Sequence, residues 1–438
     1  MVTSISTISK QANQPYTHLN PNVDGLKPSA TLAINELSNS LIAEGKKVYK
    51  FGLGQSPFPV PKTVVKALKQ NAFQKDYLPV KGLASLRLAV AESNKKTLGI
   101  SCTLEDVMIG PGSKELLFLL QFAYGADLVL PSSSWVSYAP QASIIGNKVH
   151  WLATEEGNDW RLSPETLEAH CLQHPNQPQI LLLNYPNNPI GTTYSTSELE
   201  GIAAIAQKYQ ILVLSDEIYG EVHYEGKHVS IAAFYPEGTI VSSGLSKWCG
   251  AGGWRLGTFT FPSNLRYLLD AMAAVASETF TSVSAPIQHA AIRAFEGGEA
   301  IDLYLQDSRR ILKVIGETIA QKLHNNHVSL PLPKGGFYLF PNFSHYKEKL
   351  NAKGIFTSSD FCQRLLEETG VAILPANAFG RPDNDLIARM AYVNFDGKKA
   401  LKVARKEYAD KPLDDDFLKK CCGETMEGID VLVNWLKQ

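Results

Sequence analysis

The chain has 438 residues, of which 44% are apolar and 19% charged, and its formal net charge is −1. This length exceeds a single typical core, so we expect two domains. The balanced charge argues against a nucleic-acid partner. Six cysteines without a C-x-x-C pair indicate reduced thiols in a cytosolic protein. Because the adjacent Cys421 and Cys422 have no His or Cys nearby, we predict no metal site.

Residues 1–30 are interpreted as an N-terminal arm. The first part of this arm is rich in Ser, Thr, Gln and Asn, and it lacks the apolar core of a signal peptide. The most apolar stretch of the chain, residues 116–130, is too short to cross a membrane and is interrupted by polar residues. We therefore expect a cytoplasmic protein without a membrane span.

From about residue 61 to 260, short apolar runs alternate with helix-like segments. Continuous runs of this kind are typical of strands that are covered on both faces. The predicted strands are 106–109, 127–130, 180–183, 211–214 and 239–241. A helix is predicted over 195–209, with Ser195 or Ser197 as its cap. The alternation favours a mainly parallel α/β sheet, and a long helix at about 298–325 leads to a second α+β block.

Polar and aromatic residues directly follow four of the predicted strands. The four segments are 110–113, 131–135, 184–188 and 215–217. In open α/β sheets, ligands bind beyond the carboxyl ends of the strands. The four segments together therefore predict one shared binding site.

Two of these segments offer hydrogen bonds to anions. Segment 110–115 (G-P-G-S-K-E) leaves a strand and enters an amphipathic helix, whose free N–H groups form an anion site with Ser113 as a cap. An ordinary capped helix is the alternative. Segment 184–191 (N-Y-P-N-N-P-I-G) holds two prolines that stiffen a turn and present asparagine amides to a phenolate or carboxylate oxygen. A stiff loop without a ligand is the alternative.

A carboxylate and an aromatic face add to this predicted site. Asp216 follows a buried strand, where a carboxylate is costly unless it meets a cation such as a protonated pyridinium nitrogen. Tyr219, three residues later, can reach a neighbouring ring oxygen. Trp135 offers a flat face for a planar ring. A helix cap for Asp216 and a core position for Trp135 are the alternatives.

Segment 242–257 (S-S-G-L-S-K-W-C-G-A-G-G-W-R-L-G) is the most informative stretch. If Lys247 is packed against a cation and kept from bulk water, it can lose its proton and attack a carbonyl. Arg255, eight positions later, offers a planar fork for a phosphate. A nucleophilic lysine together with a phosphate-binding arginine is what a pyridoxal phosphate (PLP) site requires. A glycine-rich turn with solvated charges is the alternative.

In chain order, N-N-P-I-G at 187–191, S-D-E-I-Y at 215–219 and the lysine segment resemble the class I/II aminotransferases, PLP enzymes of the aspartate aminotransferase fold (fold type I). Further similar segments are 51–57, 76–87, 335–340, 374–380 and 389–392. The resemblance implies an α/β fold: a large domain with a mainly parallel seven-stranded sheet flanked by helices, and a smaller α+β domain built from both termini. The implied bounds are 61–310 for the large PLP-binding domain, and 31–60 with 311–438 for the small domain.

The resemblance also implies roles for single residues. The implied catalytic residues are Lys247, which forms the Schiff base with PLP and moves the proton, Asp216, which keeps the ring nitrogen protonated, and Tyr219. The implied cofactor-binding residues are Gly112, Ser113, Lys114, Trp135, Asn188, Asp216, Tyr219, Ser243, Ser246, Lys247, Arg255 and Tyr77. The implied substrate-binding residues are Gly54, Asn188 and Arg389, which pairs with the α-carboxylate. Because Tyr77 acts in the second subunit's site in this family, a homodimer is implied.

The sequence departs from the family pattern at Gly244, where a serine is common, so Ser243 or Ser246 is left to serve the phosphate. Ile190 replaces a threonine, and Asp396 makes the segment after Arg389 unusual. The predicted function is a PLP-dependent aminotransferase that moves an amino group between an L-amino acid and a 2-oxo acid by a ping-pong mechanism. Aspartate or an aromatic amino acid is the first expected amino-acid substrate. A PLP-dependent lyase or synthase that acts by elimination is the alternative. A non-catalytic PLP-fold binding protein is a more distant one.

Overall fold

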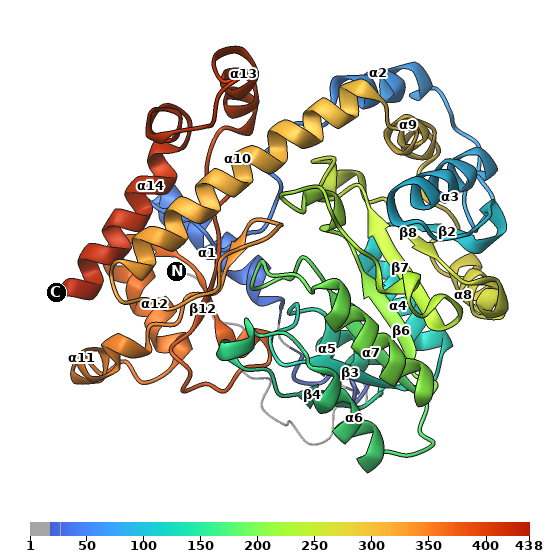
Figure 1. The fold of residues 1–438 in the computed structure, drawn as a ribbon, viewed down its shortest axis with the longest axis horizontal. Coiled ribbons are helices and arrows are strands. Elements are labelled where there is room, and N and C mark those ends of the chain that lie inside the picture. The colour runs from blue at the N-terminus through green and yellow to red at the C-terminus, as the bar shows by residue number, and fades with distance from the viewer. Residues whose placement is uncertain (1–17, 27) are drawn as a thin grey trace.

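A seven-stranded sheet forms the centre of the larger part of the molecule (Figure 1). The computed structural model describes residues 18–26 and 28–438, so most of the predicted arm, 1–30, lies outside the described residues. The strands are β2 (Val107–Gly110), β3 (Asp127–Pro131), β4 (Val149–Leu152), β5 (Gln179–Asn184), β6 (Leu212–Asp216), β7 (Thr239–Gly244) and β8 (Gly257–Thr260). Their order across the sheet is β2-β8-β7-β6-β5-β3-β4. Neighbours from β7 to β4 are parallel, and β8 is antiparallel to β7 and β2, which confirms the mainly parallel sheet.

All five predicted strands form, as β2, β3, β5, β6 and β7, with slightly shifted ends. Every residue of β5 is buried, as expected for a strand covered on both faces. Strands β4 and β8 of this sheet were not predicted from the sequence. Strand β4 lies at the edge of the sheet, and most of its residues are partly exposed, so it carries no continuous apolar run.

Helices pack on both faces of this sheet. They are α2 (Lys62–Asn71), α3 (Ala84–Leu98), α4 (Ser113–Ala123), α5 (Tyr138–Ile145), α6 (Pro164–Gln173), α7 (Thr196–Lys208), α8 (Arg266–Ser277) and α9 (Ala285–Phe295). Alternate strand residues face opposite sides: Leu182 joins the core under α4, α5 and α8, whereas Leu181 and Leu183 join the core under α6 and α7. Ser195 caps α7 through a capping box, in agreement with the predicted helix start.

A second, smaller group of elements is built from both ends of the described chain. Its elements are α1 (Ala30–Ala43), β1 (Tyr49–Lys50), β9 (Tyr338–Leu339), α11 (Lys347–Ala352), α12 (Ser358–Thr369), β10 (Val371–Ala372), β11 (Leu374–Pro375), β12 (Ala388–Ala391), α13 (Gly397–Glu407) and α14 (Asp415–Lys437). Strand β1 pairs in parallel with β10, and β11, β12 and β9 form an antiparallel sheet. Segments from before and after the large sheet therefore lie side by side (Figure 1).

The long helix α10 (Glu299–His324) runs across the molecule between the two groups (Figure 1). It matches the helix predicted at about 298–325. The largest core cluster is continuous across the predicted boundary, since it contains Phe51, Val64 and Ile315 together. The domain bounds at 61 and 310 therefore stay a prediction. None of the helices formed by residues 18–26 and 28–438 is both long and apolar enough to cross a membrane.

Candidate active site

The carboxyl ends of the central strands surround a cavity of about 200 Å³. Ten of the predicted site residues line it: Gly54, Ser113, Lys114, Trp135, Asn188, Asp216, Tyr219, Ser246, Lys247 and Arg255. Gly54 comes from the segment after β1, and the others come from the ends of β2, β3, β5, β6 and β7 or the segments that follow them. Arg255 precedes β8, and because β8 runs antiparallel, its first residue lies at the same edge of the sheet. The predicted shared site is thus assembled by the strand order.

Lys247 is partly buried just after β7. Its Nζ donates a hydrogen bond of 2.9 Å to the carbonyl of Gly54 and lies 5.5 Å from the centre of the Tyr219 ring. Burial lowers the pKa of this amine to about 8, and the nearby positive charge of Arg389 acts in the same direction. The neutral, nucleophilic form of Lys247 is therefore much more accessible than that of a surface lysine.

Asp216 ends β6 and is 2% exposed. The hydroxyl of Tyr138 donates to its Oδ2 at 2.7 Å, and the hydroxyl of Ser242 donates to its Oδ1 at 3.3 Å. Burial nevertheless raises the pKa of this carboxyl to about 6, and these hydrogen bonds only partly oppose the rise. A buried carboxylate of this kind is ready to accept a cationic partner in the cavity.

The asparagine loop after β5 presents one amide to the cavity. Asn184 fixes the loop, because its side chain donates to the Asp216 carbonyl and accepts from the backbone N–H of Asn188, both at 2.8 Å. The Oδ1 of the buried Asn188 has no hydrogen-bond partner within the described part of the chain. A buried polar atom left in this state points to a ligand that would satisfy the amide.

Aromatic side chains form the walls. Trp135 packs edge-to-face on Tyr138, with ring centroids 5.2 Å apart, and its ring lies on the cavity surface. The hydroxyl of Tyr219 is 2.8 Å from that of Tyr338. Burial raises the pKa of Tyr219 well above its ordinary value, so this phenol stays protonated and can donate a hydrogen bond.

Helix α4 begins at the opposite end of the cavity, beside Arg255. Gly112 caps the helix with φ 92°, so Ser113 is its first residue rather than its predicted cap. A side chain on Gly112 would meet the Arg255 guanidinium at 2.2 Å, and one on Gly257 would meet the Ser113 backbone nitrogen at 2.2 Å. Burial and the Arg255 charge lower the pKa of Lys114. Helix N–H groups and these two cations together form a cradle for an anion.

Arg389 lies behind the cavity wall and is fully buried. Its guanidinium donates to the Gly52 carbonyl and lies 5.0 Å from the centre of the Tyr338 ring. Its Nε finds no hydrogen-bond partner among residues 18–26 and 28–438. The hydroxyl of Tyr338 meets that of Tyr219 at 2.8 Å, and Lys247 Nζ lies 5.5 Å from the centre of the Tyr219 ring, so Arg389 and Lys247 border the same pair of tyrosines.

Two predicted residues lie elsewhere. Ser243 lines a different cavity, because successive residues of β7 point to opposite faces and Ser242 is the one that faces Asp216. Tyr77, between α2 and α3, is 92% exposed and reaches no part of this cavity. Gly244 has no room for a serine side chain, since a Cβ there would lie 2.7 Å from the Leu256 carbonyl oxygen.

The roles of Tyr138 and Asn184 were not predicted from the sequence. Tyr138 follows Trp135 by three residues, and Asn184 opens the asparagine loop, so both lie in or beside the segments predicted to form the site. Their partner Asp216 is 78 residues from Tyr138 and 32 from Asn184. These separations explain why the sequence alone offered no signal for either contact.

Comparisons with known proteins agree with this geometry. The family model described as aminotransferase class I and II matches residues 46–392. An asparagine–oxo-acid transaminase of Streptococcus mutans is 32% identical over 86% of this chain and 95% of its own. An aspartate aminotransferase of Geobacillus stearothermophilus is 31% identical over 84% and 93%. The structure of a Thermus thermophilus aspartate aminotransferase with maleate superposes with a TM-score of 0.80 at 28% identity, covering 90% of this chain and 99% of that chain.

Proposed function

Because the chain belongs to the class I and II aminotransferases and is an amino acid–oxo acid transaminase, we propose that pyridoxal phosphate is its cofactor and binds in the cavity at Lys247. The observation that carries this proposal is the pairing of an amine of pKa about 8 with a buried carboxylate in one cavity. The unpartnered Asn188 amide oxygen also fits a ligand with a polar ring.

Bound pyridoxal phosphate supplies an electron sink that makes the Cα proton of an attached amino acid acidic. Lys247 Nζ would be the nucleophile that holds the cofactor covalently, and the same amine would carry a proton to and from Cα of the substrate. Asp216 would pair with the protonated ring nitrogen. That cation in turn favours the ionised form of the carboxylate, which burial alone opposes.

The remaining lining residues would contact different parts of the cofactor. Asn188 and Tyr219, which line the cavity, would hold the phenolic oxygen of the ring, and Trp135 would stack on the ring face. Three side chains and the start of α4 hold the phosphate: Ser113, Lys114 and Arg255. Of the two candidate serines, Ser246 lines this cavity, so we assign the serine contact to Ser246 rather than Ser243.

We assign the substrate α-carboxylate to Arg389, which would exchange the Gly52 carbonyl for a bidentate anion. A side chain on Gly54 would collide with the Tyr338 hydroxyl, and Gly54 and Gln55 both line the cavity. L-aspartate is the first expected amino donor, followed by L-asparagine, because the two relatives are an aspartate aminotransferase and an asparagine–oxo-acid transaminase. Aromatic amino acids remain the third candidate group.

We further propose a homodimer, because the highly exposed Tyr77 would complete the phosphate site of the partner subunit. Phe73, in the same segment, is 74% exposed, which also favours an interface there. All six cysteines are free thiols, which fits the reducing cytoplasm as its location.

The test is amino-group exchange by the purified protein reconstituted with pyridoxal phosphate. L-aspartate, L-asparagine and L-tyrosine are each supplied with 2-oxoglutarate, and glutamate formation is measured beside the visible spectrum of the bound cofactor. Lys247→Ala is the test variant, and Lys313→Ala, a surface lysine paired with Glu225, is the control. We expect exchange with aspartate, loss of exchange and of the covalent cofactor band in Lys247→Ala, and neither loss in Lys313→Ala.

Other outcomes separate the alternatives. Release of ammonia without glutamate would identify an eliminating enzyme. The amino-acid and oxo-acid transaminases among the relatives do not favour that reading. A cofactor band without any turnover would indicate a binding protein. A full band in Lys247→Ala would contradict the assignment of the lysine.

A further inference from the structure

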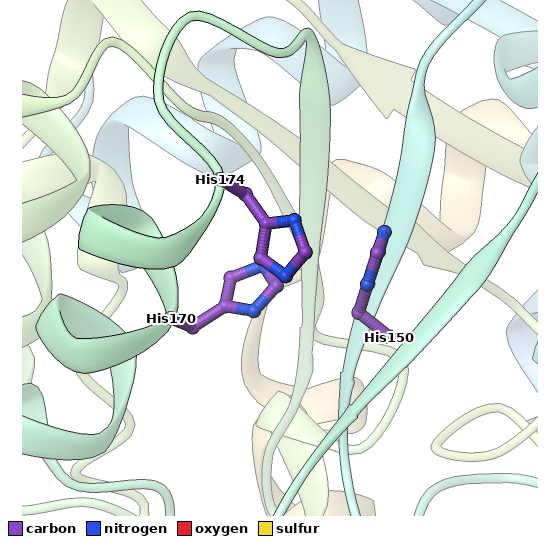
Figure 2. Close-up of side chains that lie close together, drawn as sticks. All are labelled: His150, His170 and His174. Carbon is purple, nitrogen blue, oxygen red and sulfur yellow. The ribbon is translucent and has the colours of Figure 1, made fainter.

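Three histidines gather beside β4, the edge strand of the large sheet (Figure 2). His150 lies on β4, His170 on α6, and His174 caps the end of α6. Their ring centroids are 4.6 Å (His170–His174), 4.7 Å (His150–His174) and 5.1 Å (His150–His170) apart. One ring nitrogen from each histidine lies within 4.8 Å of the other two. Figure 2 shows the two rings from α6 turned toward the ring from β4.

The fold explains why these rings meet. His170 and His174 are four residues apart, so they lie one above the other on one face of α6. That helix packs against the edge strand β4, which carries His150. Asp127, which contacts His150, is the first residue of β3 and lies at the amino end of the parallel strands. The cluster is therefore separate from the cavity, which lies at the carboxyl ends.

Two observations indicate that ring nitrogens of His170 and His150 are free to bind a further group. His170 is 7% exposed, and its Nε2 has no hydrogen-bond partner in the described segments. A buried nitrogen in this state costs stability unless something binds it. His150 Nε2 is 2.9 Å from Asp127 Oδ2, which leaves its other ring nitrogen available. A carboxylate behind a histidine is the usual support of a metal-binding imidazole.

We propose that His150, His170 and His174 bind one divalent transition-metal ion of the zinc class, with Asp127 orienting His150. Three imidazoles and one water form a tetrahedral set that suits Zn²⁺, Co²⁺, Ni²⁺ or Cu²⁺. Mg²⁺ and Ca²⁺ are not the expected ions, because they prefer oxygen ligands.

Binding requires only a small closure of the rings. Tetrahedral Zn–N bonds of about 2.0–2.1 Å place ligand nitrogens about 3.3 Å apart. The histidine nitrogens lie within 4.8 Å of one another, so ring rotations that move each nitrogen by about 1 Å bring them to the spacing that a tetrahedral ion requires. His150 and His174 are partly exposed, at an edge strand and a helix end, where such movement is easy and an ion can enter. The ion would then fasten α6 to β4.

Burial and the two neighbouring histidines lower the pKa of His170 to about 4. The ring is therefore neutral at pH 7, which is the form that offers a lone pair to a metal. This agrees with the geometry but adds nothing to the choice of ion.

The test uses tag-free holoenzyme that has been freed of metal with a chelator. Zn²⁺ is titrated by calorimetry, and Co²⁺ is followed by its visible d–d absorption. We expect one tight equivalent of Zn²⁺, a tetrahedral Co²⁺ spectrum without thiolate bands, and a rise in melting temperature on adding Zn²⁺. Asp127→Asn should weaken the affinity about 10- to 100-fold.

Two ligand variants and a control decide the outcome. We expect the tight equivalent to disappear in His174→Gln and in His150→Gln, while transaminase activity and the cofactor spectrum stay unchanged. His345→Gln is the control, because His345 stacks on His327 at 4.6 Å and the part of the chain that the structure describes places no third metal-ligating side chain with this pair. This variant should bind Zn²⁺ like the unaltered protein. The absence of tight binding in the unaltered protein, or equal binding by all three variants, would overturn the proposal. Neither result depends on the assignment of pyridoxal phosphate to Lys247.

Discussion

Burial acts in opposite directions on the two ionisable groups that face each other in the active-site cavity. It lowers the pKa of Lys247 to about 8 and raises that of Asp216 to about 6, so both groups are pushed toward their neutral forms. The lysine needs its neutral form to act as a nucleophile, whereas the aspartate needs its charge to hold a pyridinium nitrogen. The fold therefore favours the active state of the lysine and relies on the cofactor to stabilise that of the aspartate.

The pKa of Lys247 predicts how fast the apoenzyme captures pyridoxal phosphate. Below about pH 8 the rate constant should fall about tenfold per pH unit, because the neutral amine becomes scarcer, and above it the rate should level off. Stopped-flow absorbance across this range measures the midpoint. Arg389→Met should move the midpoint upward, because the Arg389 charge lowers the pKa of Lys247. A midpoint near 10.5, the value of an ordinary lysine, in the unaltered protein would contradict this account.

Asp216→Asn should make the apoenzyme more stable at pH 7 and the holoenzyme less active. A folded-state pKa of about 6, against an ordinary 3.8, means that the folded apoenzyme favours the protonated carboxyl. The resulting stabilisation is complete below about pH 4 and is lost as the pH rises through about 6. At pH 7 the neutral amide should therefore make the apoenzyme more stable, by up to about 3 kcal/mol. Since the amide cannot pair with a pyridinium ion, kcat should fall about 10²- to 10³-fold.

Thermal melts of both apoproteins at pH 7 and pH 4, together with steady-state kinetics of the holoenzymes, test this prediction. The stability advantage of Asp216→Asn should vanish at the lower pH, where both side chains are neutral. An equal advantage at both pH values would contradict the assigned cause, because it would point to better packing instead. Unchanged kcat would contradict the pairing with the ring nitrogen.

At the level of single residues, the sequence identified those whose chemistry is unusual for their setting. A lysine among glycines and a carboxylate after an apolar run, Lys247 and Asp216, are visible without a structure. Tyr138 was not identified, because a tyrosine is ordinary at most positions and its contact with Asp216 spans 78 residues. The histidine cluster was not predicted from the sequence for a similar reason. His170 and His174 show a helical spacing, but the third ring comes from another element.

Secondary structure elements were predictable where burial is uniform. Strand β5 is buried along its whole length and reads as a continuous apolar run. Strand β8 was missed because its four residues, G-T-F-T, include two threonines and a glycine, although all four are buried. Its glycine, Gly257, stands against the first turn of α4, and this close approach decides the residue type more than strand propensity does.

The contact between β8 and α4 predicts the effect of Gly257→Ala. The added methyl would lie 2.2 Å from the Ser113 nitrogen and 2.4 Å from the Gly112 carbonyl carbon, so the first turn of α4 must shift. Because that turn is assigned to the phosphate, the affinity for pyridoxal phosphate should fall about tenfold or more. Equilibrium titration of the apoenzyme with the cofactor measures it.

Gly125→Ala provides the matched control, since within residues 18–26 and 28–438 no atom beyond its two chain neighbours lies within 4 Å of a Cβ there. Its cofactor affinity should equal that of the unaltered protein. If Gly257→Ala binds the cofactor equally well while remaining folded, the phosphate lies away from the start of α4.

At the scale of the whole molecule, the α/β class and the parallel sheet could be predicted, because alternating strands and helices leave few other arrangements. The continuity of the core from Phe51 through Val64 to Ile315 could not, since it depends on the packing of α10 against both groups of elements. The sequence also predicted that Tyr77 belongs to a site. In the single chain this residue is 92% exposed, so the role proposed for it would have to be played in the site of a second subunit.

Hybrid dimers test whether Tyr77 works across a subunit interface. Tyr77→Ala and Lys247→Ala homodimers should both be impaired, because each lacks one component in both sites. In a hybrid of the two chains, one site combines the intact Tyr77 of one subunit with the intact Lys247 of the other, and the second site carries both losses. Random reassociation makes about half of the dimers hybrid, so the mixture should recover up to about a quarter of the unaltered activity. Unfolding and refolding the chains together, followed by the exchange assay, measures this recovery. If Tyr77 serves the site of its own chain, every hybrid site lacks one component and mixing restores nothing.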